Sequence, residues 1–401
     1  MLNYFNKFIV SIGLLFLILG LSENLSAQKV RLRAQITPDC GSTSTAKFAD
    51  IYADGNIAVQ GGYDCRGVFI YDISNPDNPQ LAAWYNPGNN QRFLEAIVVG
   101  NRGYFGSGSG GGGVHIVDLT NPYAPTLLGV VNSAKGNAFN SIHEMLIWGD
   151  YLIENFNGFS NKIIKVINIS NPAVPVFIRD INPTEMQWVH AMHIRGNRMF
   201  TSGWGNSTNR GRTEIYDITN IGTQAPTLLG FIEDTSSTTA GNNMHSSWTS
   251  EDGNYLYSCR ETNNGDGDVR VYDIRNPAQP LLVNRISMQS LGLNAVTPHN
   301  PVVMGNLLYV AWYQAGLQVF DITQPNAPTR VGQYDTFQPA FFETDEPNRL
   351  TDEPWDFVCG INSLRNNLPT SFDGDWAVYQ FLGQDKVLVG DLSNGLLILD
   401  V

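Results

Sequence analysis

The stretch Val68-Phe69-Ile70-Tyr71-Asp72-Ile73-Ser74-Asn75-Pro76 recurs, with small changes, along the whole chain. In every full copy, apolar residues alternate with variable ones and lead into Asp or Asn, then Ile or Leu, then a short polar turn. Further copies lie at 114–122, around Asn168, Asp217, Asp273 and Asp321, and, truncated, at 396–401. A pattern that returns at regular intervals indicates a protein built from repeated structural units.

Each repeat contains four short strand signals. In one unit these signals are residues 189–195, 198–202, 213–217 and 226–232. Gly196-Asn197, between the first two, is a dipeptide typical of tight hairpins. The polar turn after the third strand bonds its own backbone, and the prolines fall in connections where they break no strand pairing. Four antiparallel strands that recur about every 45–55 residues are typical of propeller blades.

The number of copies predicts the number of blades. Six complete third strands and the truncated copy at 396–401 indicate seven blades. Residues 30–36 form one further strand that belongs to no complete repeat. We therefore predict an all-β, seven-bladed β-propeller, closed by pairing this N-terminal strand with the C-terminal blade, which removes exposed strand edges. Six or eight blades remain open as alternatives if the irregular insertion at about 335–375 hides or replaces strands.

The chain divides into two parts. Residues 1–27 are predicted to be a signal peptide, with Lys7 before an apolar run at 8–21 and Ala27 at the cleavage point. Residues 28–401 are predicted to form a single propeller domain, in which the acidic, aromatic insertion is either a cap or a ligand-facing lid. This apolar run is too short for a membrane span, and the sequence contains no other long apolar segment. We expect an exported protein in the periplasm, at the cell surface or outside the cell.

Charge and cysteine content limit the partners and the compartment. The formal net charge of −13 disfavours nucleic acid as a partner. Export permits disulfides. Cys40 and Cys65 flank the first strand pair of the first repeat and are candidates for a bridge, although four cysteines allow three connectivities. Cys259 lies in an alternating apolar run, where we expect a buried free thiol.

The repeat resembles the LVIVD repeat, and the chain from about residue 30 to 401 resembles the choice-of-anchor B family of secreted bacterial propellers. The segments that carry the resemblance are His245-Ser246-Ser247-Trp248-Thr249, Pro298-His299-Asn300 and Gly374-Asp375-Trp376. The resemblance implies a secreted propeller. It implies no catalytic residues, because the family has no general assigned activity.

Four histidines occupy matching places in successive repeats. His143, His190 and His299 stand at the same distance before the hairpin glycine of their repeat, and His245 is displaced by a slightly longer turn. The first strand of a blade is the innermost, so these imidazoles are predicted to meet at the mouth of the central channel. The predicted channel-mouth binding residues are His143, His190, His245, His299, Glu95 and Trp376.

Three roles for the four histidines remain open: organising the ring, binding a transition metal such as zinc, copper or iron, and acid–base catalysis. Asp50 and Glu144 are candidate helpers at the same level. Glu144 follows His143 directly, so the two face opposite sides of the strand unless a bulge intervenes. His193 is expected to pack against a neighbouring blade.

Calcium is a less favoured ligand. Residues 263–268 resemble part of a calcium-binding loop but lack its remaining ligand positions, so a tight turn is preferred.

These observations predict a binding or scaffold module for a cell-envelope protein, a glycan or a small ligand, acting through the channel-mouth face. The alternative is a metal-dependent hydrolase or oxidoreductase that uses the four histidines. No complete catalytic motif is present in the sequence, which favours the binding module and leaves the catalytic residues unknown.

Overall fold

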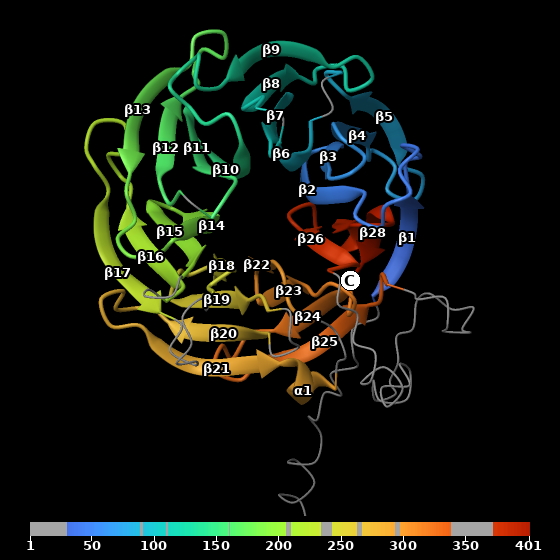
Figure 1. Cartoon of the computed structure of the whole chain (residues 1–401). Helices are drawn as coiled ribbons and strands as arrows, with labels where there is room; N and C mark the ends of the chain where they lie inside the picture. Colours follow the sequence, from blue (N-terminus) through green and yellow to red (C-terminus); the bar gives the residue numbers. More distant parts are fainter. Residues whose placement is uncertain are drawn as a thin grey trace, which may run out of the picture.

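The computed structural model describes residues 30–88, 91–109, 111–159, 161–205, 210–233, 243–262, 267–292, 297–337 and 372–401. The predicted signal peptide, Cys359 and most of the predicted insertion at about 335–375 lie outside these residues. The described residues form seven four-stranded antiparallel sheets arranged around a central axis (Figure 1). The predicted seven-bladed propeller is therefore confirmed.

Blades one to four follow one another along the chain, each running from its innermost to its outermost strand. Blade one holds β2 (Phe48–Asp54), β3 (Ile57–Gly62), β4 (Val68–Asp72) and β5 (Gln80–Tyr85). Blade two holds β6 (Phe93–Val99), β7 (Arg102–Ser107), β8 (Val114–Asp118) and β9 (Thr126–Val131). Blade three holds β10 (Ile142–Trp148), β11 (Tyr151–Phe156), β12 (Ile164–Asn168) and β13 (Val176–Ile181). Blade four holds β14 (Trp188–Arg195), β15 (Arg198–Trp204), β16 (Arg212–Asp217) and β17 (Thr227–Glu233).

Blades five and six repeat the arrangement, and blade seven takes strands from both ends of the described chain. Blade five holds β18 (Ser246–Thr249), β19 (Tyr255–Arg260), β20 (Asp268–Asp273) and β21 (Leu281–Ser287). Blade six holds β22 (Pro301–Met304), β23 (Leu307–Ala311), β24 (Leu317–Asp321) and β25 (Thr329–Tyr334). Blade seven holds β26 (Asp375–Tyr379), β27 (Val387–Asp391), β28 (Gly395–Asp400) and β1 (Arg31–Ile36). Two short helices, α1 (Met288–Leu291) and η1 (Gln384–Lys386), complete the described elements.

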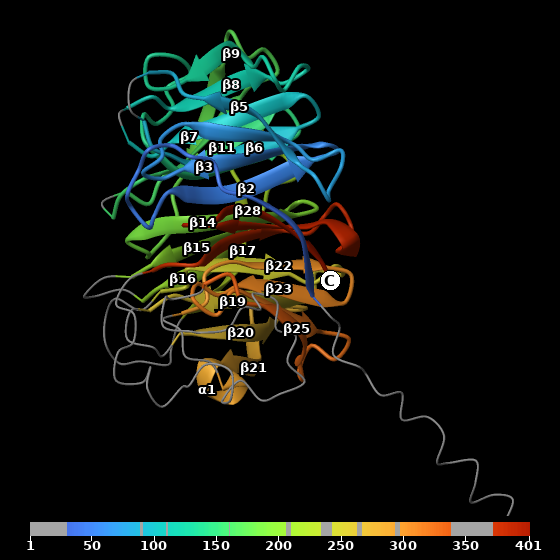
Figure 2. The ribbon, with the colours of Figure 1, turned by 90° about the vertical axis from the view of Figure 1, so that its right-hand side faces the viewer.

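The ring closes through strand pairing between the N-terminal and C-terminal segments. β1 lies antiparallel to β28, with Arg31 opposite Asp400 and Ile36 opposite Leu396. Figure 2 shows the disc from its edge, where β1 runs along the rim. The predicted closure is confirmed. No helix of the described residues is long and apolar enough to cross a membrane.

The recurring Asp or Asn of the repeat has a structural role. Its side-chain oxygen accepts a hydrogen bond from the backbone N–H two residues later, which fixes the turn between the third and fourth strands. The donor–acceptor distance is 3.0 Å at Asp72, 2.8 Å at Asp118, 3.1 Å at Asn168, 2.9 Å at Asp217, 3.1 Å at Asp273 and 2.7 Å at Asp321. The repeated phrase therefore stabilises the blade and does not belong to the channel.

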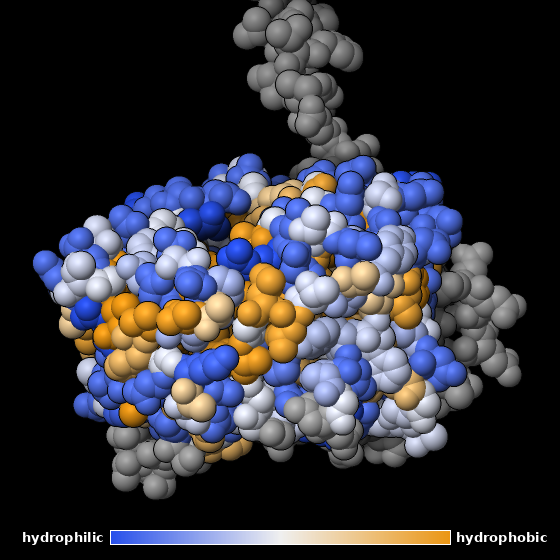
Figure 3. All heavy atoms as spheres, turned by 90° about the horizontal axis from the view of Figure 1, so that it is seen from above, coloured by the Kyte–Doolittle hydropathy of each residue, from blue (hydrophilic) through white to orange (hydrophobic). Residues whose placement is uncertain are grey.

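The core lies between neighbouring blades. Phe200 and Ile215 of blade four, for example, pack with Leu256 and Ile274 of blade five. The outer strands also leave apolar side chains in solvent, such as Leu127, which is 51% exposed. Figure 3 shows apolar residues gathered in a band along the rim. Burial between sheets, which stabilises each blade pair, thus extends around the whole ring.

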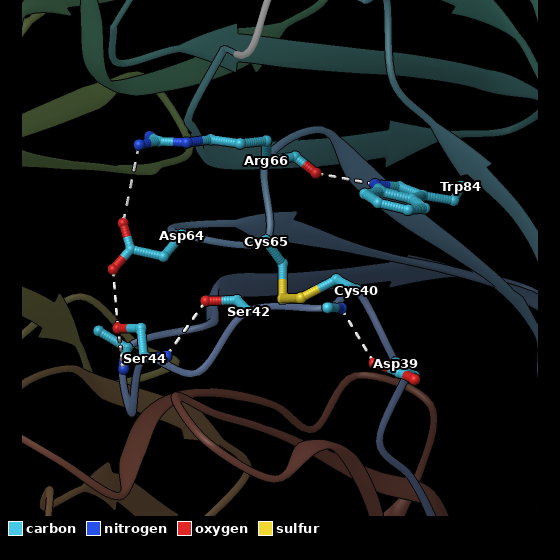
Figure 4. The surroundings of a disulfide bond; sticks show 10 residues. Asp39, Cys40, Ser42, Ser44, Asp64, Cys65, Arg66 and Trp84 are labelled. Atoms are coloured by element: carbon cyan, nitrogen blue, oxygen red, sulfur yellow. Dashed lines mark hydrogen bonds and ion pairs between the residues drawn. A yellow bond between two sulfur atoms is a disulfide. The ribbon is translucent and has the colours of Figure 1, made fainter.

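A disulfide ties the segment after β1 to blade one. Cys40, between β1 and β2, is bonded to Cys65, between β3 and β4 (Figure 4). Asp64, beside Cys65, accepts a hydrogen bond from the Ser44 hydroxyl at 2.7 Å and pairs with Arg92 at 2.9 Å. Cys259 is a buried free thiol in β19. The bridge therefore anchors the chain where it passes from the closing strand to the first blade.

We predict that replacing Cys40 and Cys65 together by Ser lowers the free energy of unfolding by about 3 kcal/mol. The bridge closes a loop with a sequence separation of 25 residues, and its loss restores conformational entropy to the unfolded chain. Urea denaturation with and without a reductant measures the effect. The wild type should lose stability in reductant and the double variant should not. Equal stability of the two oxidised proteins would contradict the prediction.

Candidate functional site

The innermost strands carry an irregularity where they enter the channel. The register shifts by one residue near the start of β2, β6, β10, β14 and β26. Such bulges bend the strand and re-aim a side chain. His143, His190 and Trp376 lie within these shifts, whereas His245 and His299 stand just before β18 and β22. The bulge therefore re-aims His143, His190 and Trp376, whereas His245 and His299 occupy the matching positions just outside their strands.

The four predicted histidines form a continuous row across blades three to six. The ring centroids are 4.2 Å apart for His143 and His190, 3.9 Å for His190 and His245, and 4.6 Å for His245 and His299. The Trp376 ring continues the row, 4.3 Å from His299. Five of the six predicted mouth residues are thus brought side by side.

Burial determines the charge of the row. It lowers the pKa of His143 to about 4 and the pKa values of His245 and His299 to about 3, and it lowers the pKa of His190 well below its usual range. The imidazoles are therefore neutral at pH 7. A neutral imidazole offers one N–H and one lone pair, so each ring can donate at one nitrogen and accept or bind a cation at the other.

Hydrogen bonds hold the rings in place. His143 Nδ1 lies 3.1 Å from Asn157 Oδ1, and the Nε2 atoms of His143 and His190 are 2.8 Å apart. His245 Nδ1 lies 3.1 Å from the carbonyl oxygen of His299. His299 Nδ1 lies 2.6 Å from the carbonyl oxygen of Trp376. The row is therefore cross-linked between successive blades.

Glu261 joins the row without having been predicted. It follows β19 directly, and its Oε2 lies 3.5 Å from His245 Nε2. Burial raises the pKa of Glu261. The donor atoms of His245, Glu261 and His299 all lie within 4.8 Å of one another. This close group contains two of the four predicted histidines, and His143 and His190 are not members of it.

The antiparallel hairpin is the signal that could have revealed Glu261. In each blade it returns the end of the second strand to the start of the first, so residues that follow the second strand also reach the mouth. Asn157 follows β11 and Tyr313 follows β23 in the same way. Tyr313 donates a hydrogen bond of 2.7 Å to Glu261. Sequence reasoning followed the first strands alone and missed this second set.

A cavity of about 250 Å³ occupies the channel and is lined by residues of all seven innermost strands. Glu95, predicted at the mouth, lines this cavity together with Asp50 and Glu144. Glu144 and its neighbour His143 sit in the bulge but have different partners, because Glu144 Oε1 accepts a 2.8 Å hydrogen bond from the Met192 N–H. A layer of three carboxylates thus follows the layer of imidazoles.

Burial raises the pKa values of all three carboxyl groups. That of Asp50 is raised to about 7. Those of Glu95 and Glu144 are raised well above their usual range, and the charge on Asp50 raises both further. At low pH the channel therefore holds neutral carboxyl groups. Their ionisation at higher pH carries the free-energy cost of placing a charge in a buried site.

Two remaining predictions concern residues beside the channel. His193 packs as expected, stacked on Trp248 of blade five at 3.9 Å and 3.0 Å from the Thr249 hydroxyl. Most of the candidate calcium loop at 263–268 lies outside the described residues. Its last member, Asp268, pairs with Arg270 at 3.0 Å and Arg285 at 3.2 Å. Arginine pairing thus occupies this carboxylate.

The ring of blades, the Asx turn of the repeat and the lined channel define a repeat-built β-propeller. The family model of the LVIVD repeat matches residues 54–87 and 300–336. The chain therefore contains LVIVD repeats within a seven-bladed β-propeller. No curated protein matched the chain.

Solved structures show the same architecture at low identity. The computationally designed Ika8 protein is 13% identical, with a TM-score of 0.54 over 89% of this chain and 97% of that one. A protein from Lactobacillus plantarum is 15% identical, with a TM-score of 0.56 over 73% and 85%. Sqt1 of Saccharomyces cerevisiae is 8% identical, with a TM-score of 0.54 over 89% and 96%. At these identities the likeness concerns the fold alone.

We predict that Asp50→Asn stabilises the protein at pH 8 by about 2–4 kcal/mol and much less at pH 4.5. The folded-state pKa of Asp50 is about 7, above the unfolded value of about 3.9. The stability that the protonated group contributes is therefore complete below the unfolded value and is lost as pH rises through the folded one. Asparagine stays neutral throughout.

Thermal and urea unfolding of both proteins at the two pH values test this. Asp385→Asn, on a carboxylate that is 76% exposed, is the matched control and should change little at either pH. A stabilisation by Asp50→Asn that is the same at pH 4.5 and pH 8 would show that the carboxyl group does not titrate as predicted.

Proposed function

We propose that this propeller is an exported bacterial binding module that takes up a glycan of the cell envelope at its channel mouth. The observation that carries the proposal is a belt of ring systems around the mouth. Its members, in order of contact, are Phe159, Trp188, His143, His190, His245, His299 and Trp376. We call them the aromatic belt.

Each belt member contacts the next. The ring centroids are 4.6 Å apart for Phe159 and Trp188, 4.7 Å for Trp188 and His143, and 3.9–4.6 Å along the histidines to Trp376 at 4.3 Å. Phe159, at one end, is 54% exposed, whereas Trp188, His245 and His299 are buried, so the exposed end is the part of the belt that a sugar ring would stack on. Rings with polar nitrogens combine an apolar face with hydrogen-bonding groups, as a sugar ring does.

Charge and compartment agree with such a ligand. The neutral imidazoles and the formal charge of −13 do not favour nucleic acid. The Cys40–Cys65 disulfide supports an oxidising compartment outside the cytosol. An envelope protein or a small ligand would use the same face, and the binding test below separates them from a glycan.

A metal-dependent hydrolase or oxidoreductase is the second candidate function. The observation that favours it is the close approach of the donor atoms of His245, Glu261 and His299. Two imidazoles and a carboxylate are the protein ligands of several catalytic metal sites. This function requires a bound metal, whereas glycan binding at the belt does not.

We predict that Phe159→Ala weakens glycan binding by about tenfold, equivalent to about 1.4 kcal/mol, because the exposed end of the belt loses a stacking ring. A microarray of bacterial envelope glycans identifies the ligand, and calorimetry with the purified glycan gives the affinities. Leu127→Ala, at a similarly exposed apolar side chain on the rim, is the matched control and should bind as the wild type does. Absence of any glycan ligand, or equal affinity of Phe159→Ala and the wild type, would refute the proposal.

A further inference from the structure

The close group of His245, Glu261 and His299 brings three donor atoms from two neighbouring blades to one point. His245 and His299 precede the innermost strands of blades five and six, and Glu261 follows the second strand of blade five. Both imidazoles are buried, at 1% and 3% exposure, and the Glu261 side chain is 12% exposed. The group therefore lies largely out of contact with solvent.

Hydrogen bonds determine which ring nitrogen of each imidazole can bind a ligand. His245 Nδ1 lies 3.1 Å from the carbonyl oxygen of His299, and His299 Nδ1 lies 2.6 Å from the carbonyl oxygen of Trp376. A carbonyl oxygen only accepts, so each Nδ1 carries the proton and donates. In the neutral ring the lone pair is then on Nε2. Carbonyl partners of this kind orient histidines that bind metals.

The carboxylate faces one of these lone pairs. Glu261 Oε2 lies 3.5 Å from His245 Nε2, and Nε2 is buried and makes no hydrogen bond. Tyr313 donates to the other oxygen, Oε1, at 2.7 Å. When Glu261 is ionised, two acceptor atoms thus approach each other in a buried place. Such an arrangement is unfavourable unless a cation or an added proton lies there.

We propose that His245 Nε2, His299 Nε2 and the Glu261 carboxylate bind a divalent transition metal of the zinc or ferrous iron class. Two imidazoles and one carboxylate suit these ions, and three protein ligands leave a coordination position for water or substrate. The Tyr313 hydroxyl would orient the carboxylate from outside the coordination shell. This site is the one on which the metal-dependent candidate function rests, and it does not depend on glycan binding.

His143 and His190 have a different role in this proposal. Asn157 Nδ2 donates to the Gly108 carbonyl at 2.7 Å, so Oδ1 is the atom that faces His143 Nδ1. His143 Nδ1 therefore donates to Asn157, and His143 Nε2 accepts from His190 Nε2 at 2.8 Å. These hydrogen bonds occupy both nitrogens of His143 and leave the lone pair of His190 on Nδ1, which is buried and makes no hydrogen bond. His143 is thus a positioning residue and not a ligand.

The test uses the whole chain, purified without a histidine tag, freed of metal and titrated with Zn²⁺ or with Fe²⁺ under argon. Elemental analysis and calorimetry should show about one ion per chain. Glu261→Gln, which keeps the side-chain shape and the Tyr313 contact, should weaken binding by at least about 100-fold. Glu154→Gln, at a buried carboxylate of β11 that is outside the close group, is the matched control and should retain the affinity of the wild type.

Two further measurements use the wild type alone and test the proposal even if Glu261→Gln fails to fold. X-ray absorption of the loaded wild type should show two imidazoles in the first shell, and the wild type should melt at a higher temperature with metal than without. The proposal is overturned if neither ion binds, if Glu261→Gln binds as tightly as the wild type, or if the shell lacks imidazole. If the protein binds neither ion and nitrogen NMR finds His245 doubly protonated at neutral pH, a proton and not a metal lies between His245 Nε2 and the Glu261 carboxylate. Phe159→Ala should leave metal affinity unchanged, so the two proposals can fail separately.

Discussion

The pairing of β1 with β28 is the constraint on which the rest of this structure depends. It supplies the fourth strand of blade seven from the opposite end of the sequence and so turns a row of blades into a ring. In a ring, every innermost strand faces one axis, and residues at equivalent positions of different blades come together although tens of residues separate them in sequence. The disulfide at Cys40–Cys65 fixes the chain directly after this strand. The channel, and any site within it, therefore depends on ring closure.

Equivalent positions form layers, and the chemistry of each layer depends on which blades contribute polar side chains. At the mouth, blades three to six contribute imidazoles and blade seven contributes Trp376. One residue further along the strands, blades one to three contribute Asp50, Glu95 and Glu144. The bulges near the strand starts separate these layers, because an extra residue lets neighbours such as His143 and Glu144 take different partners. An asymmetric site can thus arise inside a nearly symmetric frame.

The sequence predicted what the repeat encodes. The blade number, the closure and the convergence of four histidines all follow from one phrase and from a constant spacing to a hairpin glycine. Two features have no such marker. The bulge at His143 depends on the pairing register with β11, which the residues of β10 alone do not reveal. Glu261 stands eight residues after the hairpin glycine of its repeat, as Asn157 and Tyr313 do in theirs, but this start of the loop holds a different residue type in each of these repeats, so no repeated residue marks it. Loops of this kind vary because they add little to the core.

Hydrogen bonding divides a row that looks uniform in sequence. His143 uses both ring nitrogens within the protein, between Asn157 and His190. His245 uses one, and its other nitrogen faces a carboxylate. Sequence position alone allows a structural role or a metal-binding role for all four histidines. The hydrogen bonds favour the structural role for His143 and His190 and the metal-binding role for His245 and His299. Repeats copy a position, but the neighbours in each blade decide its chemistry, because a lone pair is available to a ligand only where no protein donor already occupies it.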